Sequence, residues 1–160
     1  MTTGVQRTLA LAVATGLRST FGPAFVAHSA GMPARRALAL MALGECVFDK
    51  LPFAPSRDTP LPTAARGIAA YWAASRGGGP RAGALAAAVA MGVSLAAPKL
   101  RRRVAETTGV QQALVGVAED AIALGLGAAA VGLTWRDVSL AAGEAVGTRR
   151  GAQSAGAGSM

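Results

Sequence analysis

Two acidic residues interrupt an apolar stretch that is long enough to cross a lipid bilayer. The stretch runs from Gly109 to Trp135, and Glu119 and Asp120 are its only charged residues. About twenty mostly apolar residues span the hydrocarbon layer as a helix. A carboxylate near the middle of such a span is costly unless it is paired, hydrated or protonated. The sequence therefore predicts a membrane protein that keeps charged groups in its interior.

The amino-acid composition also favours a membrane protein. Of the 160 residues, 52% are hydrophobic, 15% are charged and 4% are aromatic, whereas soluble domains carry about 25% charged residues. A soluble domain needs large side chains to fill its core, but in a bilayer small residues let helix backbones approach closely. The many alanines and glycines therefore favour a membrane bundle over the alternative, a soluble alanine-rich helical bundle.

Sixteen Lys and Arg residues against eight acids give a net charge of +8. The basic residues concentrate in short connections, as is typical of segments that flank membrane helices and meet anionic headgroups. A nucleic-acid module would need aromatic residues among the bases, so we predict membrane lipids, and no nucleic acid, as partners. The densest basic group, which we assign to lipid headgroups on the cytoplasmic side, consists of Lys99, Arg101, Arg102 and Arg103.

The apolar pattern predicts an all-α bundle of four or five membrane spans over residues 1–136. We expect principal helices over residues 5–30, 34–51, 82–98 and 108–135, and a shorter helix over residues 64–76. Prolines mark residues 51–63 as a loop, and Arg-Gly-Gly-Gly-Pro over residues 76–80 predicts a turn. If the short helix crosses the bilayer there are five spans and the N-terminus is cytoplasmic; if it lies in the interface there are four. Residues 137–160 are expected to form a largely disordered Gly/Ala/Ser-rich tail.

The two halves of the predicted bundle resemble each other. Ala10–Pro23 and Ala84–Pro98 each combine a small-residue helix with a glycine and then a proline about two turns later. Glu45 and Glu119 follow these prolines at similar intervals. The pattern predicts an internal duplication of a helix pair. The repeats are inverted, as in many transporters, if the short middle helix spans the membrane, and parallel if it does not.

Charged residues inside the predicted helices form the candidate site: Arg18, Glu45, Asp49, Glu119 and Asp120. Glu45 and Asp49 are four residues apart and share a helix face, whereas Glu119 and Asp120 are adjacent and cannot both face one neighbour. An unpaired guanidinium is prohibitive inside a membrane, so we expect Arg18 to pair with Glu45 or Glu119. Either these charges only hold helices together, or one carboxylate stays unpaired and serves as a proton or cation site.

Two functions are open at this point. The first is a transport or channel-like role for a small ion, a proton-coupled solute or a lipid-derived anion, with Glu45 and Glu119 in contact with the cation or proton and Arg18 as counter-charge. The alternative is a structural or accessory membrane protein whose buried charges only join helices. We expect a homodimer in the first case, because four or five helices barely enclose a pathway.

An enzyme is not favoured by the motifs in the chain. The sequence contains neither a nucleophile elbow nor a His-Glu-x-x-His motif. Cys46 and His28 are the single cysteine and the single histidine, so no intrachain disulfide and no histidine metal cluster can form. We therefore predict no metal and no cofactor.

Several short motifs occur in a characteristic order along the chain: Gly16-Leu-Arg-Ser19 ahead of a proline, Glu45-x-x-x-Asp-Lys-x-Pro52, Arg66-Gly67, Lys99 with its arginines, and Glu119-Asp120. Together they resemble a family of bacterial multi-pass membrane proteins known as domain of unknown function 4126, from about Leu9 to Leu133. The polar residues that precede the acidic pair in that family are replaced here by Gln112-Ala113 and Gly116. The resemblance implies a protein of the bacterial inner membrane with the same charged residues, and it implies no particular activity.

Overall fold

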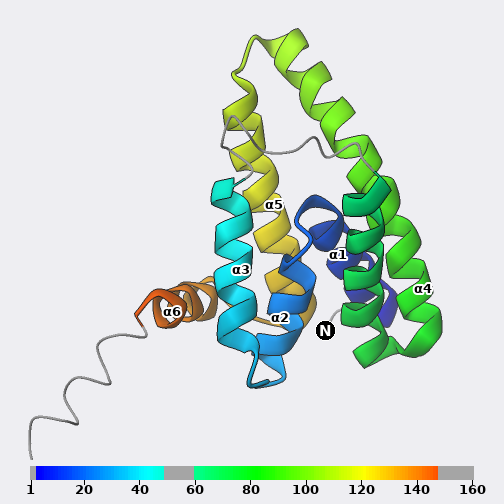
Figure 1. The fold of residues 1–160 in the computed structure, drawn as a ribbon, viewed down its shortest axis with the longest axis vertical. Helices are drawn as coiled ribbons and strands as arrows, with labels where there is room; N and C mark the ends of the chain where they lie inside the picture. Colours follow the sequence, from blue (N-terminus) through cyan, green and yellow to red (C-terminus); the bar gives the residue numbers. More distant parts are fainter. Residues whose placement is uncertain (1–2, 49–59, 148–160) are drawn as a thin grey trace, which may run out of the picture.

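The computed structural model describes residues 3–48 and 60–147, which fold into helices without any strand among them (Figure 1). This confirms the predicted all-α class. The helices of the described residues are α1 (Gly4–Leu17), α2 (Phe21–Ser29), α3 (Arg35–Phe48), α4 (Pro60–Thr108), α5 (Gln112–Val131) and α6 (Trp135–Val146).

The long helix α4 consists of two antiparallel arms, residues 60–78 and residues 80–108 (Figure 1). They meet at Gly79, whose φ of 72° and ψ of −174° suit glycine, which has no Cβ to clash. Pro80 opens the second arm, where a missing backbone N–H is tolerated. The predicted turn is therefore confirmed. The first arm is longer than the short helix that we expected, because it begins at Pro60 inside the predicted proline-rich loop and extends for about 28 Å at 1.5 Å per residue.

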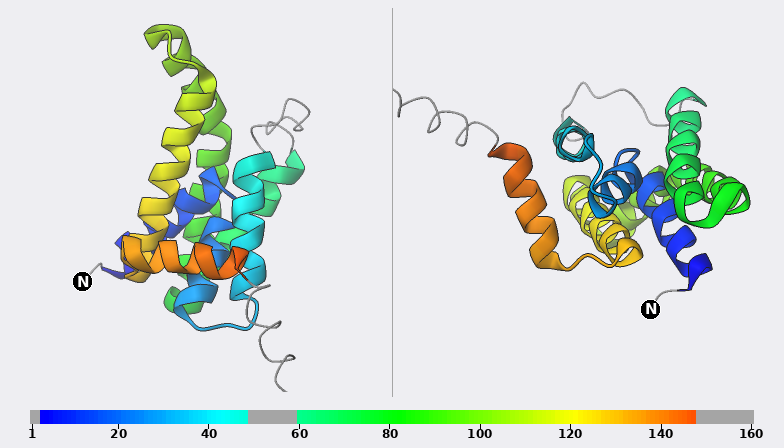
Figure 2. Two further views of the ribbon diagram at one scale, coloured as in Figure 1. Left: turned by 90° about the vertical axis from the view of Figure 1, so that its left-hand side faces the viewer. Right: turned by 90° about the horizontal axis from the view of Figure 1, so that it is seen from below.

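The second arm of α4 does not end at Pro98, where the sequence analysis placed its end. It continues to Thr108, because the residues that follow the proline are mostly good helix formers, such as Leu, Arg, Ala and Glu. The chain then returns as α5, which ends at Gly132 in the left-handed conformation (φ 73°, ψ 23°) typical of a helix C-terminus. The second arm and α5 thus form a long hairpin whose tip extends beyond the other helices (Figures 1 and 2).

The single helix predicted over residues 5–30 is instead an antiparallel hairpin made of α1 and α2. Gly22 of α2 lies so close to Thr15 of α1 that a Cβ on the glycine would come within 2.0 Å of the threonine Oγ1. Further from the turn, Leu11 and Val26 belong to one buried cluster. Because both pairs are centred on the same point of the sequence, the two helices run in opposite directions away from it.

The break between α1 and α2 precedes the proline that was expected to kink the helix. Arg18 ends α1 with an extended backbone (φ −139°, ψ 112°), and α2 begins at Phe21. Pro23 therefore lies in the first turn of α2, where its missing N–H has no partner to lose. The chain reverses at residues 18–20, which we call the hairpin turn.

The hairpin enters the bundle from the end at which the two arms of α4 join, which we call the Gly79 end. Near this end, a Cβ on Gly78 would lie 3.8 Å from Thr8 Oγ1 of α1. Deeper in the bundle, a Cβ on Gly16 would lie 2.8 Å from the Ala90 carbonyl oxygen of the second arm. Helix α1 therefore runs parallel to the second arm, and the hairpin turn points away from the Gly79 end (Figure 1).

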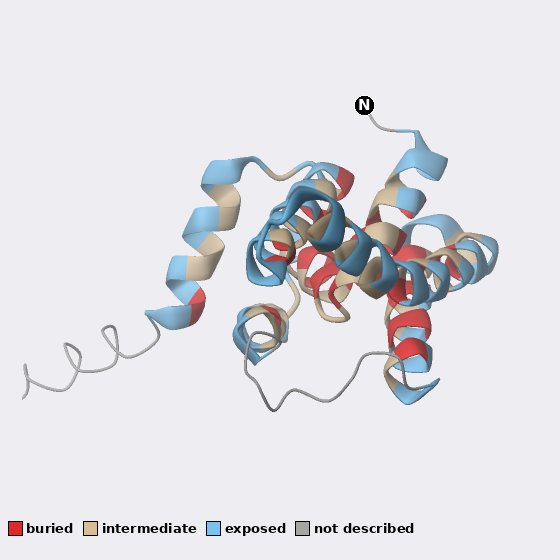
Figure 3. Cartoon of the chain, turned by 90° about the horizontal axis from the view of Figure 1, so that it is seen from above, coloured by how far each residue is buried: buried red, intermediate tan, exposed pale blue. Residues whose placement is uncertain are grey.

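Alanines make up most of the buried hydrophobic core, together with Leu11, Phe21, Phe25 and Val26, whereas many large apolar residues are exposed. Figure 3 shows the buried residues gathered where the helices face one another. The cluster that joins α1 to both arms of α4 contains Ala12, Ala70, Ala74, Ala86 and Ala90. Large hydrophobic residues on the outer faces include Met41, Val47, Leu61, Ile68, Leu95, Leu100, Leu114 and Ile122. This distribution reverses the usual arrangement of a soluble protein, in which the large aliphatic residues are most often buried.

The beginning of the predicted tail is a helix. Thr134 and Asp137 form a capping box that starts α6, because each side chain accepts a hydrogen bond from the backbone N–H of the other residue. The pKa of Asp137 lies below its usual range. The largest cause is the hydrogen bond that the Thr134 hydroxyl donates to its carboxylate, and the next is the bond from the Thr134 backbone N–H. Helix α6 packs on α3 and lies across the bundle (Figure 2). The tail from residue 148 lies outside the described residues.

Two helices of the described residues, Pro60–Thr108 and Gln112–Val131, are long and apolar enough to cross a membrane. The predicted bundle of four or five spans and the internal duplication remain predictions. The two halves differ in one respect: the first half breaks at the hairpin turn, whereas the second arm of α4 continues through Pro98.

The close contact of α1 with α4 predicts an asymmetry between two glycines. A Cβ on Gly16 would lie 2.7 Å from Val93 Cβ and 2.8 Å from the Ala90 carbonyl oxygen, whereas a Cβ on Gly92 would meet nothing within 4 Å. We expect Gly16→Ala to lower the free energy of unfolding by about 1–3 kcal/mol. The control Gly92→Ala should leave it unchanged or raise it by up to about 1 kcal/mol. Unfolding of both variants in detergent measures this; equal effects would contradict the packing of α1 on α4.

Candidate functional site at the hairpin turn

The carboxylate of Glu45, on α3, is held by the hairpin turn through four hydrogen bonds. Ser19 donates to Oε1 from its backbone N–H at 2.9 Å and from its hydroxyl at 3.0 Å. Thr20 donates to Oε2 from its backbone N–H at 3.1 Å and from its hydroxyl at 2.7 Å. Each carboxylate oxygen thus receives one N–H and one O–H, and the turn forms a two-pronged oxyanion site that α3 fills.

An arginine from the first arm of α4 lies beside this carboxylate. The Nη2 atom of Arg66 is 3.9 Å from Glu45 Oε1, and its Nη1 donates to Ser94 Oγ of the second arm at 3.1 Å. The Nε atom of Arg66 is buried and has no hydrogen-bond partner, although the residue is only 5% exposed. A buried guanidinium normally fills all its donors, so the positive charge beside the turn is only partly satisfied.

Arg18 at the end of α1 forms an ion pair with Asp120 of α5. Its Nε also donates to the same carboxylate oxygen, and Arg18 is 2% exposed. The expected partner of Arg18 was Glu45 or Glu119, and the structure instead brings Asp120 to it. Glu45 is engaged by the adjoining turn, which leaves the carboxylate of α5 that faces α1 as the counter-charge.

Glu119 contacts a different helix from its neighbour Asp120, in line with the expectation that adjacent residues cannot face one element. It forms a half-buried ion pair with Arg101 of the second arm. Arg101 therefore contacts α5 rather than standing free with the basic group at this end. The other members of that group, Lys99, Arg102 and Arg103, are exposed.

Among the described residues, ion pairs join α1 to α5, α3 to the first arm of α4, and α5 to the second arm of α4. Ser94 lies 14 residues beyond Pro80 and Arg66 lies 12 residues before Gly78, so both are about 20 Å from the Gly79 end at 1.5 Å per residue. The structure brings together Arg18, Glu45, Glu119 and Asp120 on neighbouring helices. The fifth candidate, Asp49, lies outside the described residues.

The polar residues that hold Glu45 are not among the residues predicted for the site. Ser19 and Thr20 precede Phe21-Gly-Pro, and serine or threonine is typical directly before the first residue of a helix. This local signal favours a helix start near Phe21, and it carries no information about the direction in which α2 then runs. Ser94 carries no such signal, because it lies within a continuous helix.

The comparisons with known proteins found no protein-family model, no curated protein and no solved structure that matches this chain. The resemblance to domain of unknown function 4126 remains a prediction.

The ion pair of Arg18 with Asp120 predicts a strong dependence between the two residues. Asp120→Ala should lower the free energy of unfolding by about 3–5 kcal/mol, because it leaves a buried guanidinium without its counter-charge. The double variant Arg18→Leu/Asp120→Leu should recover most of this loss, and Glu106→Ala, at an exposed acid of α4, should change stability by less than about 0.5 kcal/mol. Unfolding of the purified variants measures these values. If the stability losses of the single variants Arg18→Leu and Asp120→Leu add up to the loss of the double variant, the two residues are not coupled.

Proposed function

We propose that this is a multi-pass membrane protein and that its α1–α2 hairpin enters and leaves the bilayer on one side. The outer faces of the helices support this placement. In the most apolar 18-residue stretch of α4 only 22% is buried, and in that of α5 only 33%, so most of the apolar residues face outward rather than into a core. Lipid is the environment that stabilises large exposed apolar surfaces. With the family resemblance, the bacterial inner membrane is the proposed location.

The Gly79 end carries the residues expected at a membrane interface. Tyr71 and Trp72 lie on the first arm of α4 near the turn, and Trp135 opens α6; these are the only tyrosine and the only two tryptophans in the chain. Tyr and Trp concentrate at headgroup level. Arg76 stacks on Trp72 with its Cζ 4.5 Å from the ring centroid, and α6 presents Trp135 and Leu140 to the outside as an interfacial helix would.

The proposed activity is transport of a small, planar, monovalent oxyanion through the hairpin turn. The observation that carries this proposal is the two-pronged site occupied by Glu45, since a carboxylate of a solute presents the same two oxygens to the same four donors. Arg66 adds a partly satisfied positive charge beside it. Glu45 is then an internal competitor, which leaves the turn when the solute anion binds.

The location of the turn supports this proposal as well. Non-helical backbone at membrane depth is tolerated where it is buried in protein or lines a pathway, as in re-entrant loops and the broken helices of transporters. The hairpin turn places backbone N–H groups about 20 Å from the Gly79 end, at the level of Arg66 and Ser94. A predicted homodimer would supply further walls for the pathway.

A structural role is the second candidate, and one observation favours it. Each described carboxylate of the candidate site has an arginine neighbour: Asp120 has Arg18, Glu119 has Arg101, and Glu45 has Arg66 at 3.9 Å. Charges that each have a partner within the chain can serve to join helices. The two candidates differ in whether the donors of the turn accept an anion from outside the chain.

We expect small carboxylates to replace the missing side chain of Glu45→Ala. This variant leaves four donors and Arg66 without their acceptor, so it should lose about 3 kcal/mol or more of stability. Sodium formate should raise its melting temperature by several degrees more than sodium chloride of equal ionic strength does. Wild type and the exposed-site control Glu106→Ala should respond equally to the two salts. Thermal unfolding in detergent measures the difference.

The same variant tests transport in proteoliposomes. Wild type should carry radiolabelled formate above the rate of protein-free vesicles, and Glu45→Ala should carry it several-fold faster because the competing carboxylate is absent. If formate stabilises Glu45→Ala but the protein carries no formate across the vesicle membrane, the transport proposal is wrong and the structural role remains. If formate stabilises Glu45→Ala no better than chloride does, the turn is not an oxyanion site.

A further inference from the structure

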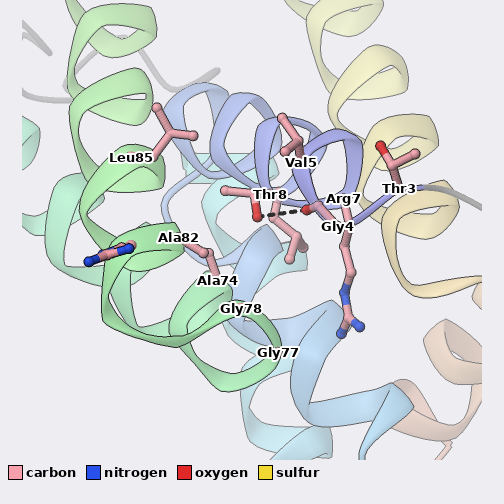
Figure 4. A pocket seen from close by; sticks show the side chains of 12 residues that line it. Thr3, Gly4, Val5, Arg7, Thr8, Ala74, Gly77, Gly78, Ala82 and Leu85 are labelled. Carbon is pink, nitrogen blue, oxygen red and sulfur yellow. Dashed lines mark hydrogen bonds between the residues drawn. The ribbon is translucent and has the colours of Figure 1, made fainter.

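A cavity of about 560 Å³ opens at the Gly79 end, between the first turns of α1 and the junction of the two arms of α4 (Figure 4). It lies at the N-terminal end of α1, whereas the hairpin turn follows the C-terminal end. The cavity shares no residue with the site around Glu45. Its volume is within the range of small-molecule sites, about 300–1,000 Å³.

Two basic side chains line the cavity. Arg7 and Arg81 are among its lining residues, and no lining residue is acidic. Figure 4 shows Arg7 reaching from α1 toward Gly77 at the junction, and a Cβ on Gly77 would lie 3.3 Å from the Arg7 Cζ atom. The glycine therefore lets the guanidinium lie flat against the backbone of α4.

Apolar side chains also line the cavity. Val5 and Leu85 lie away from Arg7 in Figure 4, and both side chains are exposed. Thr8, Leu11 and Ala74 form the buried part of the lining. A ligand that fits this lining carries both a negative charge and hydrocarbon.

We propose that this cavity binds the phosphate headgroup of an anionic phospholipid, with Arg7 and Arg81 at the phosphate and the glycerol and first acyl carbons against Val5 and Leu85. Basic pockets between membrane helices bind such headgroups, and guanidinium groups match phosphate oxygens well. The neighbouring Arg76–Trp72 contact is the kind of pair that sits at headgroup level. The inference rests on the proposed membrane placement, and it does not depend on anion transport.

The test is native mass spectrometry of the detergent-purified protein titrated with phosphatidylglycerol, phosphatidylcholine or inorganic phosphate. We expect wild type to retain phosphatidylglycerol in preference to phosphatidylcholine. Arg7→Gln/Arg81→Gln should weaken phosphatidylglycerol binding by about thirtyfold, because each basic residue at a membrane surface contributes about fivefold. The matched control Arg36→Gln/Arg136→Gln removes the same charge from exposed positions that do not line the cavity and should retain wild-type affinity.

A second variant keeps the charges and fills the space. Ala82 lines the cavity and is half-buried, so Ala82→Leu should melt at the wild-type temperature without lipid and yet lose phosphatidylglycerol binding. The proposed site is wrong if both pairs of arginine substitutions weaken phosphatidylglycerol binding equally, or if Ala82→Leu binds this lipid as tightly as wild type does. Inorganic phosphate that binds as tightly as the lipid would identify a soluble anion as the ligand and overturn the lipid assignment. Either result would leave the prediction of formate flux through the wild-type protein unchanged.

Discussion

The hydrogen bonding of the hairpin turn to Glu45 is the interaction on which the arrangement of this bundle depends. A chain that reverses inside a helical bundle exposes backbone N–H groups that must find acceptors, and one carboxylate of α3 accepts from Ser19 and Thr20 of the turn. The ion pair of Arg18 with Asp120 fixes the same turn to α5. With its tip held in this way, the α1–α2 hairpin fills the space between the arms of α4 and the helices α3 and α5.

Close packing by small residues makes this arrangement possible. Alanines occupy the contacts of α1 with α4, and Gly16 lets the two backbones approach until there is no space for a Cβ. Such contacts bury little apolar surface, so hydrophobic burial alone would stabilise them weakly in water. The large apolar residues lie on the outer faces instead. The interior is held together by close contacts and charge-assisted hydrogen bonds, which is the balance that is typical of helices associating in lipid.

The sequence predicted the helical class and the glycine turn of α4, and it singled out Arg18, Glu45, Glu119 and Asp120, each of which forms an ion pair with another helix. These follow from local patterns: apolar periodicity, a Gly-Gly-Gly-Pro run and charges inside apolar stretches. It did not predict that the first apolar stretch folds back on itself, because the break depends on an acceptor, Glu45, that is 26 residues away from Ser19 in the chain. It also gave Arg18 the wrong carboxylate, since the choice among acids on different helices is made by the three-dimensional packing. The prediction that the third helix ends at Pro98 was wrong, because the hydrogen bond lost at the proline does not outweigh the good helix formers on both sides of it.

The side of the membrane on which α2 ends is the most direct test of this account. In a Cys46→Ala background, single cysteines at Gly4, Ala34 and Val110, all exposed positions, can be labelled with an impermeant maleimide from either face of sealed vesicles. We expect the cysteines at Gly4 and Ala34 to react from one face and the cysteine at Val110 to react from the other. Reaction of the Ala34 cysteine from the same face as that at Val110 would show that α1 and α2 together cross the bilayer, and would contradict a hairpin that returns to its own side.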